Sequence, residues 1–241
     1  MDRIKFIRKE EKKYHDHCYD NYRLFEKGSW LYKPVKSVME SIALLEGKAP
    51  LNVLDLGAGV GRNSIPIAEE IKDKGGRVVC VDLLDSAIEK LIEYSKEFDV
   101  ADIIETEKAD IDQYSIKEEE YDVIVAVSSL EHVSSENILE RVLNQMTQGT
   151  KKGGINCIII NSEIEEIEIE TNKRHDALME VNLTTDRMID KLTNNYKGWK
   201  VVKQLVRPLE YQIVRDEKPV LLKSNVITFV VHQNSNECSR F

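Results

Sequence analysis

Hydrophobic and polar positions alternate between two spacings along residues 51–161. Short apolar stretches rich in β-branched residues lie at 51–56, 77–82, 102–108, 121–128 and 155–161. Between them, apolar residues recur with the helical period over 62–73, 85–97 and 136–148. Strands that alternate with helices are typical of a parallel sheet covered on both faces. We expect Asp85 to cap the second of these helices.

The pattern changes after residue 161. A polar, acidic segment, 162–183, precedes a predicted helix that begins near Thr184 or Thr185. Two longer strand-like stretches follow at 199–215 and 224–233, joined by a turn that contains Asp216 and Pro219. They predict an antiparallel pair at the sheet edge. The predicted fold class is therefore α/β, a Rossmann-like doubly wound sheet of about seven strands, mostly parallel, with an antiparallel C-terminal strand.

The chain has no internal repeat and no low-complexity linker, so we expect residues 1–241 to form a single domain. We expect three parts within it: an N-terminal helical lid at 1–32, a cofactor-binding core at 33–161, and a C-terminal substrate-side segment at 162–241. The N-terminal part has the alternative of a helix with one face packed on the core. The last residues, 234–241, are predicted to be a frayed end.

Composition narrows the class of protein. A hydrophobic fraction of 41% and a charged fraction of 32% are typical of a folded soluble protein. No stretch reaches the roughly 18 apolar residues of a membrane span, and the charged N-terminus lacks the apolar segment of a signal peptide. The four cysteines lie far apart without a CxxC pair, which predicts no metal site and no disulfide framework. A reducing, cytoplasmic location is expected.

The charge disfavours a nucleic-acid partner, because 34 Lys and Arg face 43 Asp and Glu for a net charge of −9. The one basic cluster, at residues 3–13, is interrupted by acids, and a solvated helix face is the favoured interpretation. The glutamate run at 163–170 is likewise interpreted as solvated surface. We expect no membrane partner, and a monomer or a homodimer.

A glycine-rich loop carries the most specific signal. Gly57, Gly59 and Gly61 follow a strand directly and open into a helix, where a ligand can approach the bare backbone. A dinucleotide site would require a third glycine at position 62, which is Arg62, and no Lys-Ser or Lys-Thr of a P-loop follows. A nicotinamide oxidoreductase is therefore disfavoured, although it would share the fold.

Three acids at strand ends indicate which ligand the loop would bind. Asp55 suits an ammonium group rather than a diphosphate, Asp82 a ribose, and Asp110 an adenine amino group. Either Asp110 or its neighbour Asp112 has the alternative of only capping a turn. A cationic adenosine ligand with an amino-acid tail and no phosphate fits the set, and S-adenosyl-L-methionine has these properties.

The ordered motifs VLDLGAGVGRNS, VVCVD, KADI, YDVIVAVSSLEHV and KKGG over about residues 51–161 resemble those of class I S-adenosylmethionine-dependent methyltransferases. The Gly-Arg-Asn-Ser step and the Gly-Trp-strand-turn-strand ending resemble the tellurite-resistance (TehB-type) and small-molecule branch. The resemblance implies a cofactor site formed by Asp55, Gly57, Ala58, Gly59, Arg62, Asn63, Asp82, Leu83, Asp110, Ile111 and Ser128. It implies S-adenosyl-L-methionine as cofactor, S-adenosyl-L-homocysteine as product and no metal.

Glu131 and His132 follow the fourth strand, where the reactive methyl should lie, and are the candidate catalytic residues. His132 has a pKa suited to accepting a proton, but it has the alternative of a structural role, as does Ser134 in capping the next helix. An acceptor that is already nucleophilic would need only alignment. The candidate acceptor-binding residues are Tyr22, Trp30, Tyr32, His132 and His175.

These observations predict methyl transfer from S-adenosyl-L-methionine to a small-molecule acceptor. Two alternatives remain open: a non-catalytic module that binds the cofactor, and a methyltransferase that acts on a protein or RNA.

Overall fold

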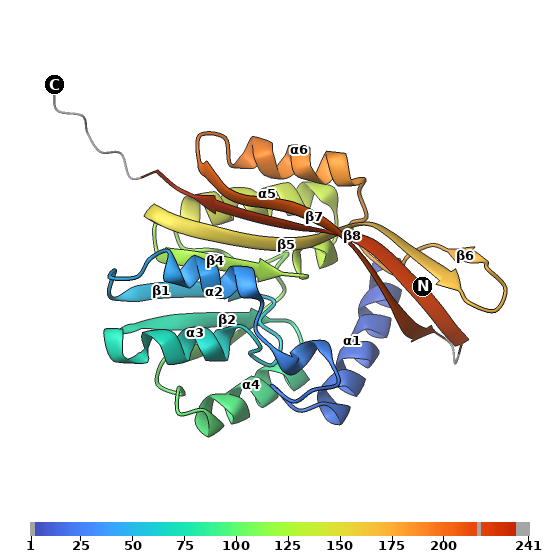
Figure 1. Ribbon diagram of the computed structural model, residues 1–241, viewed down its shortest axis with the longest axis horizontal. Coiled ribbons are helices and arrows are strands. Elements are labelled where there is room, and N and C mark those ends of the chain that lie inside the picture. The colour runs from blue at the N-terminus through green and yellow to red at the C-terminus, as the bar shows by residue number, and fades with distance from the viewer. Residues whose placement is uncertain (1–2, 216–217, 235–241) are drawn as a thin grey trace.

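One mixed sheet organises the computed structural model, which describes residues 3–215 and 218–234 (Figure 1). Its strand order is β3-β2-β1-β4-β5-β8-β7, with the short β6 paired to β5. The strands are β1 (Leu51–Leu56), β2 (Gly76–Asp82), β3 (Ile104–Lys108), β4 (Tyr121–Val127), β5 (Thr150–Glu168), β6 (Arg174–His175), β7 (Lys200–Arg215) and β8 (Lys218–His232). β1 to β5 are parallel, whereas β8 is antiparallel to both β5 and β7. The predicted fold class is confirmed.

Helices cover both faces because successive strand residues point to opposite sides. Val53 packs with α2 (Lys36–Ala43), α3 (Ser64–Ile71) and α4 (Asp85–Glu97), and Leu54 packs with α5 (Glu136–Gly149) and α6 (Thr185–Asn195). Three short 3-10 turns complete the described elements: η1 (Trp30–Tyr32), η2 (Lys72–Lys74) and η3 (Leu130–His132).

The C-terminal strands are longer than the sequence predicts. β5 continues through the acidic segment to Glu168, and β8 begins at Lys218, so Pro219 lies in a strand opposite Val214. The prediction that the glutamate run is solvated is wrong for Glu166 and Glu168, which are buried. Asp216 and residues 235–241 lie outside the described residues.

Glu166 and Glu168 are buried because basic partners accompany them. Arg215 Nη2 lies 3.2 Å from Glu166 Oε1, and Lys218 Nζ lies 2.9 Å from Glu168 Oε1. Burial of a carboxylate is tolerated where a cation and hydrogen bonds offset its desolvation.

Two predicted helix caps are also corrected. The residue preceding α4 is Leu84, and Asp85 is the first helical residue, so Asp85 does not cap the helix. The backbone N–H of Leu84 instead hydrogen-bonds to Asp82 Oδ1 at 2.9 Å. For α5 the cap is Ser135, whose hydroxyl accepts from the N–H of Ile138, rather than Ser134.

The N-terminal helix α1 (Arg3–Asn21) reaches the carboxyl ends of four parallel strands (Figure 1). Its basic residues divide into two groups. Lys12 and Lys13 are exposed and pair within the helix, as a solvated face would. Arg3 and Arg8 do not fit that prediction: Arg3 donates to the carbonyl of Ala177 and Arg8 contacts Asp110.

Among the described residues, none of the helices combines the length and apolar character that a bilayer crossing requires.

Candidate active site

The glycine loop adopts backbone conformations that favour glycine. Gly57 has φ +78°, and a Cβ there would lie 2.4 Å from Cβ of Ser129. Gly59 has φ +56°, and a Cβ at this position would meet only the hydroxyl of Tyr19, at 3.1 Å. Gly57 is thus required for packing against the end of β4, whereas Gly59 turns its bare backbone toward α1. The loop is a cradle that side chains at these two positions would fill.

Asp82 is fixed at the end of β2 by backbone donors. The N–H of Gly59 donates to Oδ2 at 2.8 Å, and the N–H of Leu84 donates to Oδ1 at 2.9 Å. A carboxylate has about four lone-pair sites, so one site on each oxygen stays available for the two hydroxyls of a ribose. The exposed Leu83 and the half-buried Ile111 lie at neighbouring strand ends, where an adenine ring would require apolar contact.

Asp55 is buried beneath the loop. Ser64 Oγ donates to its Oδ2 at 2.6 Å, while Oδ1 is buried without a hydrogen-bond partner. Burial raises the pKa of Asp55 to about 6, because desolvation disfavours the carboxylate. The unpartnered oxygen and the raised pKa fit an acid that gains a cationic partner such as an ammonium group.

Arg62 and Asn63 contact the N-terminal segment. Arg62 Nη1 donates to the carbonyl of Trp30 at 3.0 Å, and its guanidinium lies 5.0 Å from the centroid of that indole ring. Asn63 Oδ1 accepts from the N–H of Val35 at 2.9 Å. The structure therefore uses both side chains to hold residues 30–35 against the loop, and Ala58 is buried beside them.

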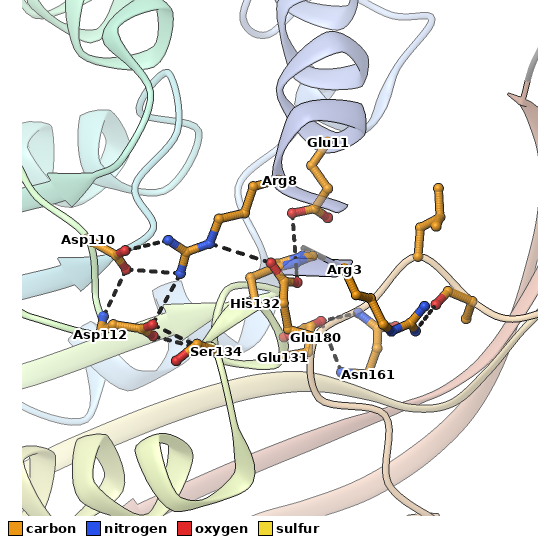
Figure 2. Close-up of polar contacts among 12 residues, drawn as sticks. Arg3, Arg8, Glu11, Asp110, Asp112, Glu131, His132, Ser134, Asn161 and Glu180 are labelled. Atoms are coloured by element: carbon orange, nitrogen blue, oxygen red, sulfur yellow. Dashed lines mark hydrogen bonds and ion pairs between the residues drawn. The ribbon is translucent and has the colours of Figure 1, made fainter. Parts of the chain in front are cut away.

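Helix α1 lies over the loops that follow four strands. The hydroxyl of Tyr19 faces Gly59 after β1, and Asp16 Oδ1 accepts from Ser86 Oγ at 2.6 Å after β2. After β3, Arg8 Nη1 lies 2.6 Å from Asp110 Oδ2, and after β4, Glu11 contacts His132. Arg8 Nη2 also contacts Asp112 at 3.1 Å (Figure 2). One helix thus contacts all four of the strand ends where the sequence places the cofactor and the methyl.

His132 lies between two carboxylates (Figure 2). Its Nδ1 is 2.9 Å from Glu11 Oε2 and 3.3 Å from Glu180 Oε2. Burial by itself would lower the pKa of His132, but these carboxylates outweigh burial and hold the pKa well above its usual value. A raised pKa favours the protonated imidazole, which has no lone pair with which to accept a proton.

Glu131 points into the protein beside His132 and has an exposed fraction of 0%. Its Oε1 accepts hydrogen bonds from Asn161, at 2.6 Å from Nδ2 and 3.2 Å from the backbone N–H. Oε2 is buried and has no hydrogen-bond partner. Burial raises the pKa of Glu131, although the hydrogen bonds from Asn161 and the charge of His132 oppose the shift. Of Glu131 and His132, it is Glu131 that has a free hydrogen-bond acceptor, its Oε2 atom.

Ser128 lies near Glu131 and has an unusual backbone conformation. It is exposed at the end of β4, with φ +49°, a conformation that non-glycine residues rarely adopt. Its Oγ is within 3.5 Å of Asn161 Nδ2. Ser128, Glu131 and Asn161 therefore form one polar group at the end of β4.

The predicted acceptor residues are not brought together as a set. The ring centroid of Trp30 lies 6.1 Å from that of His15 and 6.3 Å from that of Tyr19, next to α1. Tyr22 is exposed at the end of α1, and Tyr32 contacts Lys33. His175 lies in β6, with Nε2 3.4 Å from Glu168 Oε2. Trp30 and His132 contact α1 through their side chains, whereas Tyr22 follows the helix directly and donates its backbone N–H to the carbonyl of Cys18 at 3.0 Å.

Several residues of the site were missed by the sequence analysis: Arg8, Glu11, Tyr19, Ser86, Asn161 and Glu180. A signal existed for α1, because residues 8, 11, 15 and 19 recur at helical spacing and form one stripe. Nothing comparable marks Glu180. Its position depends on a backbone hydrogen bond of 2.9 Å from the N–H of Val181 to the carbonyl of Glu131.

Comparisons with known proteins match the central part of the chain to a family. Residues 53–154 match the family described as "Methyltransferase domain". Over 114 residues, 44% of this chain and 29% of the relative, the sequence is 28% identical to the human tRNA N(3)-cytidine methyltransferase METTL2B. The matched part spans less than a third of that relative's length.

Solved structures show the fold. The chain is similar to TehB from Haemophilus influenzae, with a TM-score of 0.60, 20% identity, and coverage of 83% of this chain and 62% of that one. It is similar to YcgJ from Bacillus subtilis, with a TM-score of 0.58, 13% identity, and coverage of 82% and 98%. The matched family model, this fold and the glycine cradle agree: residues 53–154 form a methyltransferase domain of the S-adenosyl-L-methionine-dependent kind.

Proposed function

We propose that this protein transfers the methyl group of S-adenosyl-L-methionine to a small-molecule acceptor and releases S-adenosyl-L-homocysteine. The observation that carries the proposal is α1, which contacts the loops after β1 and β3, the first turn of α4 after β2, and η3 after β4. A helix that contacts all four of these segments would cover the place where the methyl would lie, and a covered site favours an acceptor of small size.

The residues that would hold the cofactor belong to the first three strand ends. Asp55 would offer its unpartnered Oδ1 to the ammonium group, and Asp82 its remaining lone pairs to the ribose. Asp110, held in place by Arg8, would accept from the adenine amino group. When bound, S-adenosyl-L-methionine supplies an electrophilic methyl group on a positively charged sulfur.

The residues that would act on the acceptor follow β4. Glu131 would accept a hydrogen bond from the attacking group at Oε2, because Asn161 already occupies Oε1. His132, paired with Glu11 and Glu180, would hold α1 in place rather than remove a proton. Rate enhancement would come mainly from alignment of the acceptor with the methyl and from exclusion of water by α1, which we propose acts as the lid of residues 1–32.

An RNA acceptor is the second candidate, because the human relative is named a tRNA methyltransferase. Two observations weigh against it. The net charge is −9, and Arg3 and Arg8 are engaged in contacts within the protein instead of forming a basic surface. A polyanion would require clustered, free cations.

Calorimetric titration with S-adenosyl-L-methionine tests the cofactor site. We expect the Asp82→Ala variant to bind about 100-fold more weakly, because two charge-assisted hydrogen bonds of about 1.5 kcal/mol each would be lost. Asp85→Ala is the matched control, since Asp85 is exposed at the start of α4 and pairs with Lys108. Equal binding by wild type and Asp82→Ala would rule out the proposed ribose contact.

Labelled methyl transfer separates the acceptor classes. The protein is incubated with methyl-labelled S-adenosyl-L-methionine and either a low-molecular-weight cell extract or a purified tRNA fraction. We expect label only in the low-molecular-weight fraction. Label in tRNA would support the second candidate, and tight cofactor binding without any transfer would support a non-catalytic module.

A further inference from the structure

Three side chains from distant parts of the chain converge beside η3 (Figure 2). Glu11 comes from α1, His132 from η3, and Glu180 from the segment between β6 and α6. One ligating atom of each lies within 4.8 Å of the other two. We propose that Glu11, His132 and Glu180 bind a divalent first-row transition-metal ion, such as Zn²⁺ or Mn²⁺.

The separations between these atoms suit a shared metal ion. Zn²⁺ binds imidazole nitrogen and carboxylate oxygen at about 2.0–2.2 Å, so neighbouring ligand atoms lie roughly 2.9–3.6 Å apart around one ion. His132 Nδ1 is 2.9 Å from Glu11 Oε2 and 3.3 Å from Glu180 Oε2. The ligating oxygens of Glu11 and Glu180 lie within 4.8 Å of each other, and the side chain of Glu11 is 21% exposed, so its rotation would bring both oxygens to one ion.

Glu180 supplies an independent indication. Its side chain is 0% exposed, and its Oε1 is buried without a hydrogen bond. The nearest cation to Oε1 is Arg8 Nε, at 3.7 Å, which is beyond hydrogen-bonding distance. A buried carboxylate oxygen without a hydrogen bond costs free energy, and coordination of a metal through both oxygens of Glu180 would remove that cost.

The surrounding charge is negative. Arg8 and His132 are the cations that face the cluster, and the carboxylates around them belong to Glu11, Glu180, Asp110 and Asp112. Even with His132 protonated, four carboxylates face two cations. A dication that displaces the imidazole proton brings the cluster closer to neutrality. The buried Glu131 next to His132 adds to the acidic surroundings.

The donor set selects the kind of ion. One imidazole nitrogen and two carboxylate oxygens suit Zn²⁺ or Mn²⁺ better than Mg²⁺ or Ca²⁺, which prefer oxygen ligands alone. Because Glu11 belongs to α1 and His132 follows β4, the bound ion ties the helix to the end of β4. Arg8 lies one turn before Glu11, and its ion pair with Asp110 helps to hold Glu11 in position. The backbone hydrogen bond from Val181 to Glu131 does the same for Glu180.

Titration of the chelator-treated protein with ZnCl₂, by calorimetry and by metal analysis after dialysis, tests the site. We expect one Zn²⁺ per chain. Glu11→Gln and Glu180→Gln should each weaken binding by more than about 100-fold, since loss even of outer-shell partners costs about 10–100-fold. Glu10→Gln is the matched control, because Glu10 is the neighbouring residue on α1 and pairs with Lys13.

A second readout covers the case in which Glu180→Gln fails to fold. The ring nitrogens of His132 are followed by NMR in the wild-type protein during the titration, and we expect Nδ1 to lose its proton and shift on addition of Zn²⁺. Saturable displacement of that proton supports the site. Binding below about 0.2 equivalents, Glu11→Gln binding as tightly as Glu10→Gln, or an unchanged His132 signal would each overturn it. None of these measurements involves methyl transfer, so their failure leaves the proposed function untouched.

Discussion

Two regions of the active site are built in different ways. The glycine-loop side, residues 55–63 and 82–84, is held by its own backbone: the N–H groups of Gly59 and Leu84 both donate to Asp82. The lid side, formed by α1, η3 and residues 177–183, is held by charged side chains from distant segments. Arg8 reaches Asp110, 102 positions away, and Glu11 reaches His132.

This difference between the two regions gives the glycine loop a fixed shape and the lid side the capacity to move. A loop fixed by short backbone hydrogen bonds keeps its shape whether or not a ligand is present, which is preorganisation. α1 is held by ion pairs together with the buried Ile7, Cys18 and Tyr19, and we propose that it opens by local unfolding to admit a cofactor beneath it. We therefore expect changes on the lid side to alter turnover or motion while leaving the shape of the glycine loop unchanged.

The largest expected effect comes from Glu131→Gln. The substitution keeps the size of the side chain but removes the carboxylate whose buried, unpartnered Oε2 we propose accepts from the attacking group. We expect the rate of labelled methyl transfer to fall at least about 100-fold, the usual range for loss of a positioned proton acceptor, while cofactor affinity stays within about twofold.

Glu136→Gln is the matched control for that experiment. Glu136 lies at the start of α5, where it pairs with Arg187 and Lys191. If both variants transfer methyl at the same rate, Glu131 has only a structural role, and the functional difference between the two sides of the site is lost.

Local patterns in the sequence account for the side of the site that could be predicted. The bounds of β1 and α4 are those the periodicity predicts, and Asp55, Gly59 and Asp82 were found because each lies at or next to the end of a strand. Each of these signals is formed by residues that are neighbours along the chain. They do not depend on how distant segments pack.

Long-range pairing accounts for what was missed. The end of β5 buries Ile164, Glu166 and Glu168, so its inward face contains acids and its period of two is hidden from a hydrophobicity pattern. The partners that make this burial possible, Arg215 and Lys218, lie about fifty residues away. The same reason hides Glu180, which contacts His132, 48 positions away, only through tertiary packing.

A smaller effect is expected from Arg8→Ala, which tests whether ion pairs hold the lid. Loss of the contacts with Asp110 and Asp112 should cost about 2 kcal/mol, between the values for exposed and buried pairs. Amide hydrogens of α1 should then exchange about 30-fold faster, whereas those of β1 and β4 should not change. Lys12→Ala removes an exposed pair of the same helix and is the control. Equal acceleration in β1 would mean that α1 is part of the core and not a lid.

The smallest effect concerns Asp55, on the glycine-loop side. Its pKa is raised to about 6 by burial, so the folded protein binds this proton more tightly than the unfolded chain does. The free energy of unfolding without ligand should therefore fall as the pH rises from about 4 to about 6.

Cofactor binding should show the opposite trend, because only the carboxylate attracts the ammonium group. The ionised fraction of Asp55 increases about tenfold between about pH 5 and pH 7, and we expect the Kd for S-adenosyl-L-methionine to fall by about that factor. Calorimetry on wild type and Asp55→Asn measures both Kd values. A pH dependence that persists in Asp55→Asn would assign it to another group and would leave His132 and Glu131, on the lid side, as the groups to examine.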